Sequence, residues 1–263
     1  MAWLGKVSKL TVCFTLLMSL MLIKAAINGG RTKSEHALVP VTPEEQAAAV
    51  VECLTAGAGA VHLHVRSRSG VESLDPDDVA RTLREVKSAA PGSAIGISTG
   101  AWIVPDPADR IRLATAWEVL PDFASVNFSE EGAADLAELL LAKGIGVEAG
   151  LCDAGNAEIF IESGLAHRCL RVLLERQEQE IEKTRETVKR IRTVLDDGGT
   201  PLERVLHGTE AMTWPMLKEA INLGYGLRIG FEDTLQLSDG SVAQSNGELV
   251  ADALKLIHAP RIP

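Results

Sequence analysis

Two histidines lie two positions apart in a short apolar segment, at positions 62 and 64. Side chains alternate between the faces of a strand, so His62 and His64 share one face while Val61, Leu63 and Val65 share the other. Two imidazoles about 6–7 Å apart along one strand can converge on a single divalent metal ion. The alternative is a pair of hydrogen-bonded core histidines. Burying two unpaired imidazoles is costly, which favours a metal site.

A second polar cluster lies at residues 228–234, where Arg228, Gly230 and Glu232 share one face of the last predicted strand. In a closed barrel only the first strand separates this strand from the histidine strand, so Glu232 can approach both rings. Two neutral imidazoles, one carboxylate and an open water position form the ligand set of a catalytic Zn²⁺, and another divalent ion fits as well. For this segment alone, the alternative is a structural Arg228–Glu232 ion pair.

Further polar residues fall at the ends of predicted strands, where barrel enzymes carry their active sites. Each one alone is explained by local hydrogen bonding to backbone. Their common placement at one face of the molecule predicts a single pocket. They are Ser98, Thr99, Ser125, Asn127, Glu148 and His207.

Short β-rich runs alternate with amphipathic runs from residue 21 onward. The predicted strands are Ile23–Asn28, Ala60–Val65, Ala94–Ser98, Phe123–Asn127, Gly146–Gly150, Cys169–Leu174, Arg204–His207 and Leu227–Phe231. The predicted helices are Pro43–Ala56, Pro76–Ala89, Asp106–Leu120, Ala133–Ala142, Asn156–Ser163, Gln177–Leu195, Glu210–Leu223 and Ser245–Ile257.

Eight strand–helix pairs in about 240 residues, without a long linker, predict an α/β fold with a single (β/α)8 TIM barrel. Thr42 before Pro43, with Glu45 at the third helical position, forms a capping box that fixes the start of the first helix. The alternative is an open doubly wound sheet. Residues 28–31 lack the Gly-x-Gly-x-x-Gly fingerprint that such a sheet carries after its first strand.

Composition excludes several classes of protein. The 263 residues are 46% hydrophobic and 24% charged, which is typical of a globular chain and excludes both disorder and a polytopic membrane protein. A net charge of −10 leaves no basic face for a phosphate backbone, so we expect no nucleic-acid partner. Four cysteines without a Cys-x-x-Cys motif indicate a reducing, cytoplasmic compartment. The tryptophans Trp102, Trp117 and Trp214 are interpreted as core or loop anchors.

We expect residues 1–20 to be an N-terminal extension and residues 21–263 to form the catalytic barrel. Lys6 and Lys9 precede an apolar run from Leu10 to Ile23, which resembles a signal peptide but is short for a membrane span. Because Met21–Asn28 has the pattern of the first core strand, we interpret residues 1–20 as an over-extended start or a disordered appendage. A membrane or export signal is the alternative.

Six segments together resemble the β-keto acid cleavage enzyme family, whose type member is the 3-keto-5-aminohexanoate cleavage enzyme. The histidine segment and the Arg-x-Gly-x-Glu-Asp segment form the specific signature, and the resemblance runs from about Met21 to Ile257. The segments are 25–29, 40–45, 57–66, 97–100, 228–233 and 245–246.

The resemblance implies a zinc-dependent TIM barrel that converts a β-keto acid and acetyl-CoA into acetoacetate and a new acyl-CoA, by Claisen and retro-Claisen exchange. It implies His62, His64 and Glu232 as metal ligands, Asp233 as the general base and Arg228 as its partner. It also implies a homo-oligomer. The remaining implied roles are polar substrate contacts from Ser98, Thr99 and Ser125 with Asn127 nearby, and a functional glutamate at Glu148.

Two departures from the family pattern concern substrate and co-substrate. Arg31 stands where the type member carries a glutamate two residues after the first-strand glycine, and a cation there predicts a neutral or acidic keto acid. Residues 174–178 replace the family's glycine-rich loop after the sixth strand, so no CoA-binding residues are assigned.

Two other functions fit the same residues. A metal-dependent hydrolase or aldolase would use the same ligands with water or an aldehyde as second reactant. Only the β-keto acid cleavage enzyme would require acetyl-CoA. A catalytically silent barrel would act as a binding partner, and it would hold no divalent ion.

Overall fold

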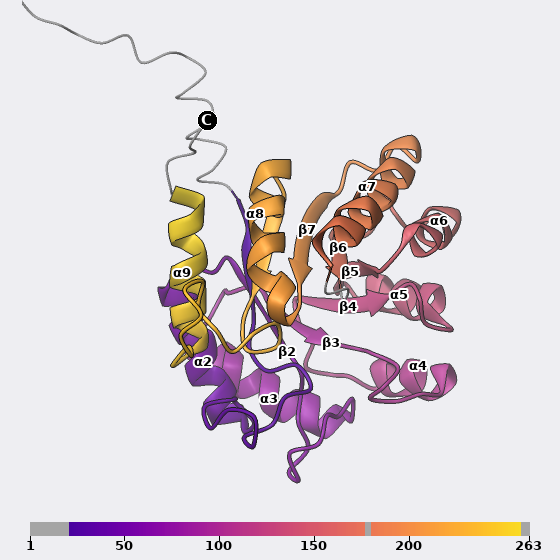
Figure 1. Cartoon of the computed structure of the whole chain (residues 1–263). Helices are drawn as coiled ribbons and strands as arrows, with labels where there is room; N and C mark the ends of the chain where they lie inside the picture. Colours follow the sequence, from indigo (N-terminus) through magenta and orange to yellow (C-terminus); the bar gives the residue numbers. More distant parts are fainter. Residues whose placement is uncertain (1–20, 177–179, 259–263) are drawn as a thin grey trace, which may run out of the picture.

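Eight parallel strands pair in chain order and close into a barrel (Figure 1). β1 pairs with both β2 and β8, which completes the ring and confirms the predicted (β/α)8 fold. The computed structural model describes residues 21–176 and 180–258. The strands are β1 (Ile23–Ala26), β2 (Ala60–Leu63), β3 (Ile95–Ser98), β4 (Phe123–Asn127), β5 (Gly146–Leu151), β6 (Arg171–Arg176), β7 (Glu203–Gly208) and β8 (Gly226–Ile229).

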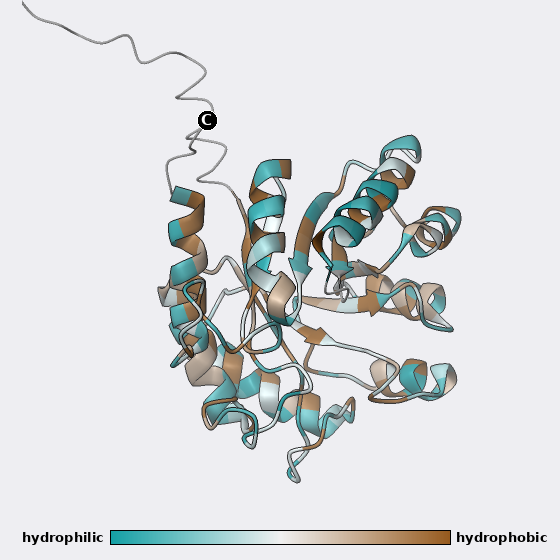
Figure 2. Ribbon diagram, viewed as in Figure 1, coloured by the Kyte–Doolittle hydropathy of each residue, from teal (hydrophilic) through white to brown (hydrophobic). Residues whose placement is uncertain are grey.

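Helices surround the strands on the outside of the barrel (Figure 1). They carry hydrophilic and hydrophobic residues side by side, as expected for helices with one face on a core and one in water (Figure 2). The helices are α2 (Pro43–Thr55), α3 (Pro76–Ala89), α4 (Pro107–Thr115), α5 (Ala133–Ala142), α6 (Ala154–Glu162), α7 (Ile181–Asp197), α8 (Thr213–Leu223) and α9 (Asn246–His258), with a 3-10 turn, η1 (Glu210–Met212), before α8.

α2, α3 and α4 begin at their predicted capping residues, whereas one of them ends early. α8 begins at Thr213 rather than Glu210, because the 3-10 turn η1 precedes it. Thr42 and Glu45 form the predicted capping box of α2. The helix predicted to reach Leu120 ends at Thr115, because Trp117 turns into the core and its indole nitrogen donates to the Leu74 carbonyl at 3.0 Å. The side chain of Trp117 is 3% exposed, which confirms it as a core anchor.

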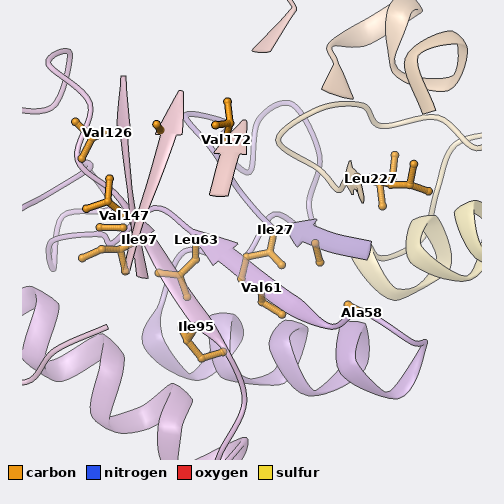
Figure 3. Packing of buried hydrophobic residues seen from close by; sticks show 14 of the residues in the cluster. Ile27, Ala58, Val61, Leu63, Ile95, Ile97, Val126, Val147, Val172 and Leu227 are labelled. Carbon is orange, nitrogen blue, oxygen red and sulfur yellow. The ribbon is translucent and has the colours of Figure 1, made fainter. Parts of the chain in front are cut away.

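The main core lies between the strands and the ring of helices. On β2 and β3 the outward-facing residues Val61, Leu63, Ile95 and Ile97 are fully buried in it, and they point together towards the helices in Figure 3. The alternate residues of these strands therefore face the inside of the barrel.

Inside the barrel, towards the amino ends of the strands, a buried ion cluster joins three strands. Lys24 on β1 contacts Glu148 on β5, whose second carboxylate oxygen lies 3.0 Å from Nε of Arg171 on β6. Lys24 and Glu148 are fully buried, and burial lowers the pKa of Lys24 despite the opposing pull of Glu148. These contacts give Glu148 a part in holding the barrel closed, and its functional role stays a prediction.

Replacing Glu148 with glutamine is expected to lower the free energy of unfolding by about 3–5 kcal/mol, because it leaves two buried cations without their shared counter-charge. Chemical denaturation measures the change. Glu203→Gln is the matched control, since Glu203 pairs with the same Arg171 at 3.5 Å but is 46% exposed and should cost less than about 1 kcal/mol. Equal effects of the two variants would contradict this account.

Two predictions fall on residues that the structure leaves undescribed. The extension over residues 1–20 and the first three residues of the helix predicted from Gln177 lie outside the described ranges. Within those ranges, no helix combines the length and the apolar character needed to cross a membrane.

Candidate active site

The two segments that carry the predicted metal ligands leave the barrel just after their strands end. β2 ends at Leu63 and β8 at Ile229, two residues earlier than predicted in each case. Beyond these points side-chain amides bond several of the backbone groups, and the Glu232 N–H donates to the carbonyl of Ala26 on β1 at 3.1 Å. His64 and Glu232 are therefore carried by strand-end loops, at the mouth of the barrel.

Asn28 and Asn246 supply these amides. Asn28 accepts a hydrogen bond from the His64 backbone N–H at 2.8 Å and donates to the His64 carbonyl at 2.9 Å. Asn246 accepts from the Phe231 N–H at 2.8 Å and donates to the Ile27 carbonyl at 2.9 Å. Both segments are thereby fixed to the end of β1, which lies between them.

Glycine is required where Glu232 approaches the end of β1. A Cβ atom on Gly29 would lie 2.3 Å from Cγ of Glu232, and the backbone of Gly29 has a φ of +53°. A Cβ atom on Gly230 would lie 2.0 Å from the Ala26 carbonyl oxygen. These two positions let the β8 segment pass close enough to place Glu232 beside the histidines.

His62, His64 and Glu232 converge at the mouth. One potential ligand atom from each lies within 4.8 Å of the other two. Oε2 of Glu232 is 3.8 Å from Nε2 of His62 and 3.5 Å from Nε2 of His64. The two imidazole rings lie edge to face with centroids 5.2 Å apart.

The geometry of this triad fits a divalent cation. Ligand atoms about 2.1 Å from a tetrahedral zinc ion are about 3.4 Å from one another, close to the two distances from Glu232 to the histidine nitrogens. Oε2 of Glu232 is buried, and no donor among the described residues satisfies it. A bound cation would satisfy this oxygen and hold the two Nε2 atoms facing it.

The three side chains also have suitable charges. Burial lowers the pKa of His62 far below its usual value, so this imidazole is neutral. Burial opposes ionisation of Glu232, but Arg228 and His64 outweigh it and hold the pKa of this carboxyl well below its usual range. Burial also acts to lower the pKa of His64, yet Glu232 and Glu72 raise it to about 9. A metal ion must therefore displace a proton from His64.

Arg228 connects the triad to Asp233. Its Nη2 lies 2.5 Å from Oε1 of Glu232 and 2.8 Å from Oδ1 of Asp233. Burial of Asp233 is outweighed by Arg228 and His207, which lower the pKa of its carboxyl. An ionised, fully buried carboxylate thus stands next to the triad, held by a guanidinium group.

His207 and Glu175 extend this network across the mouth. Nδ1 of His207 lies 3.1 Å from Oδ1 of Asp233, and its Nε2 lies 3.9 Å from Oε1 of Glu175. Glu175 and His207 are pairing partners on β6 and β7. Sequence reasoning predicted only a weak role for His207 and none for Glu175. The signal was their position at consecutive strand ends, since inward-facing residues at equal register meet in a barrel.

The predicted substrate contacts divide into two groups. Ser98 and Ser125 pair in register on β3 and β4, two residues beyond the Gly96 that pairs with His62, so they lie on the mouth side of that histidine. By contrast, the Thr99 hydroxyl donates to the Ser125 carbonyl at 2.6 Å, and the Asn127 amide donates to Glu130 at 2.9 Å. Ser98 and Ser125 are better placed for a substrate than Thr99 and Asn127.

Arg31 lies at the rim of the mouth, between the loops that follow β1 and β7. Its Nε donates to the Phe231 carbonyl at 2.5 Å, and its two terminal nitrogens bond Glu35 and Glu210. Glu210 has a φ of 51°, an unusual value for a residue other than glycine, and its N–H donates to the Asp233 carbonyl at 2.7 Å. The Arg31–Glu210 pair therefore ties the rim to the backbone of Asp233.

Comparison with known proteins gives one family model and one relative that match nearly the whole chain, and a further relative that matches part of it. The family model described as beta-keto acid cleavage enzyme matches residues 21–261. The 3-keto-5-aminohexanoate cleavage enzyme of Fusobacterium nucleatum is 26% identical over 257 residues, which cover 91% of this chain and 92% of that protein. The 3-oxoadipate:acetyl-CoA acetyltransferase of Cupriavidus necator is 39% identical over 80 residues, 30% of this chain and 28% of that protein.

Solved structures share the fold. ObcA in complex with oxaloacetate superposes with a TM-score of 0.65 at 18% identity, and the match covers 81% of this chain and 62% of that one. At this identity the likeness concerns the barrel alone.

Proposed function

We propose a function from one premise, that this chain belongs to the β-keto acid cleavage enzyme family, matched over residues 21–261. The enzyme exchanges acyl groups between a β-keto acid and acetyl-CoA, and it releases acetoacetate and a new acyl-CoA. The observation that carries the proposal is the convergence of His62, His64 and Glu232 beside the Arg228–Asp233 pair.

The exchange balances without an oxidant or a hydrolytic water. The α-carbon of the β-keto acid loses a proton and forms a bond to the acetyl carbon of acetyl-CoA, which releases the CoA thiolate. The thiolate then forms a bond to the keto carbon of the original acid, and the bond from that carbon to the α-carbon breaks. The products are the new acyl-CoA and acetoacetate, whose α-carbon takes the proton back.

The residues at the mouth match the needs of this exchange. Asp233 is ionised and takes the α-proton, while Arg228 keeps it charged and oriented at the cost of some basicity. The hydroxyls of Ser98 and Ser125 are placed to bond the substrate. His62, His64 and Glu232 would hold a divalent cation. That ion, which we propose to be zinc, would polarise the keto oxygen and stabilise negative charge on it.

The experiment that tests the function is incubation of the metal-loaded protein with acetyl-CoA and a panel of β-keto acids. Acetoacetate and acyl-CoA are expected in equal amounts, and both should require acetyl-CoA. Turnover without acetyl-CoA would instead indicate a hydrolase or an aldolase. A protein that binds no divalent ion and turns over no member of the panel would be a silent barrel.

We propose that the substrate is an acidic β-keto acid. The name of the Cupriavidus necator relative gives 3-oxoadipate, a dicarboxylic β-keto acid, as its substrate. Arg31 supplies a cation at the rim, and protein acceptors use only three of its five N–H groups. The remaining N–H groups can bond the distal carboxylate.

Replacing Arg31 with glutamine is expected to lower kcat/KM for a dicarboxylic β-keto acid about tenfold relative to a neutral one, because a charge-assisted hydrogen bond is lost. The measurement is the ratio of kcat/KM values for the two substrates. Glu35→Gln is the control, since it removes a neighbour of Arg31 without removing the cation. An unchanged ratio in the Arg31 variant would mean that the guanidinium does not contact the substrate.

We further propose a cytoplasmic homo-oligomer. The buried free thiols of Cys53 and Cys169 support a reducing compartment. Large apolar side chains are exposed at Leu38, Ile159 and Val242, among others, and a subunit contact could bury them. Light scattering on the purified protein tests the assembly.

A further inference from the structure

Two residues outside the family signature contact the back of the His64 ring. Oε1 of Glu72 lies 2.5 Å from Nδ1 of His64, on the opposite side of the ring from the Nε2 that faces Glu232. The same Glu72 oxygen accepts a hydrogen bond from the Trp102 indole nitrogen at 3.1 Å. The Trp102 ring also stacks on His64, with centroids 6.0 Å apart and an interplanar angle of 26°.

This arrangement determines which nitrogen of His64 carries the proton. An imidazole binds a metal through an unprotonated nitrogen, so Nε2 can serve as a ligand only when the remaining proton is on Nδ1. A carboxylate 2.5 Å from Nδ1 accepts that proton's hydrogen bond and fixes both the tautomer and the ring plane.

Glu72 reaches this position because the loop after β2 folds back on itself. Arg66 and Glu72 form an antiparallel bridge, and the Ser73 N–H donates to the Val65 carbonyl at 3.0 Å. Gly70, with a φ of +84°, provides the turn. The loop thereby returns Glu72 to the mouth of the barrel, beside the end of the strand that carries His62.

Trp102 lies on the loop after β3, and its position depends on a neighbouring glycine. Its side chain is 56% exposed, which is unusual for tryptophan. A Cβ atom on Gly100 would lie 2.2 Å from the indole ring, so glycine at this position makes room for it. Trp102 was expected to be a core or loop anchor, and its ring and its N–H lie against the His64–Glu72 pair.

We propose that Glu72 and Trp102 are positioning residues for the metal ligand His64. Glu72 holds the His64 proton on Nδ1 and directs Nε2 towards the ion, and Trp102 fixes the Glu72 carboxylate and covers the imidazole. This inference rests on the proposed metal site, and it concerns the affinity and geometry of that site rather than the identity of the substrate.

The test measures cobalt and zinc binding by the full-length protein, with cobalt absorption as a spectroscopic readout. Glu72→Ala is expected to weaken zinc affinity about 10–100-fold in competition with a chelator, and to change the cobalt spectrum. Glu72→Gln should recover part of the affinity, because its amide oxygen still accepts from Nδ1. Trp102→Phe keeps the ring and loses the N–H, so it should weaken affinity less than Glu72→Ala. Glu85→Gln, at an exposed position on α3, should change neither readout.

Two results would overturn the proposal in different ways. Wild-type affinity and spectrum in both Glu72 variants would exclude the positioning role while leaving the proposed function intact. Absence of zinc binding by the wild-type protein would remove the proposed function itself. If Glu72→Ala does not fold, Glu72→Gln and Trp102→Phe decide, and affinities within twofold of wild type in both would exclude the role.

Discussion

Replacing His62 with alanine is expected to lower acetoacetate release by more than about 10³-fold, because the ion that would polarise the keto oxygen loses one of three protein ligands. His62 is 2% exposed, and burial keeps its imidazole neutral, so it is suited to bind a cation directly. The measurements are initial rates with saturating acetyl-CoA and the metal content of the purified variant.

His167→Ala is the matched control, because His167 is exposed on the loop before β6 and should leave rate and metal content unchanged. Treatment of the wild-type protein with a chelator should reproduce the loss, and added zinc should reverse it in the wild type but not in the His62 variant. A His62 variant with near-normal turnover would exclude the metal-dependent mechanism.

The barrel was predictable because each strand is a local pattern. Alternation along β2 places Val61 and Leu63 in the outer core and His62 inside, as the sequence alone indicates. Chain-order pairing then brings the end of β8 beside the end of β1, so the approach of Glu232 to the histidines follows from topology. The family resemblance was confirmed by the match over residues 21–261.

Two errors in the predicted strand ends lie at the candidate site. β2 and β8 were predicted two residues too long. After Leu63 the His64 backbone bonds the Asn28 side chain. After Ile229 the chain turns, and the Asp233 N–H donates to the Gly230 carbonyl at 2.8 Å. β-Strand propensity does not distinguish an extended residue whose backbone bonds an amide side chain from one whose backbone pairs with a neighbouring strand.

The residues that sequence reasoning missed belong to contacts between distant loops. Glu72 reaches His64 only because its loop folds back, and Glu175 reaches His207 only through the pairing of β6 with β7. Lys24 was assigned to an apolar strand, yet it carries a charge into the barrel because Glu148 faces it from the opposite side. Neither loop geometry nor a contact between residues 124 positions apart leaves a local pattern.

Replacing Asp233 with asparagine is expected to lower kcat about 10²–10⁴-fold, because the amide cannot take the α-proton. Metal affinity should stay close to that of the wild type, since Asp233 contributes no atom to the triad. The fold should survive, because Arg228 keeps Glu232 at 2.5 Å and Glu175 at 3.8 Å as partners for its charge. Rates of acetoacetate release and zinc competition measure the two effects separately.

A large loss of kcat with retained metal would distinguish the role of Asp233 as a general base from the role of a metal ligand. The control is Asp252→Asn, whose carboxylate bonds the Ser238 N–H at 2.9 Å away from the triad and should leave kcat unchanged. If the Asp233 variant kept kcat within tenfold of the wild type, another group would have to take the proton. Of the titratable side chains described at the mouth, His207 would then be the candidate, because it lies 3.1 Å from the same carboxylate and pairs with Glu175.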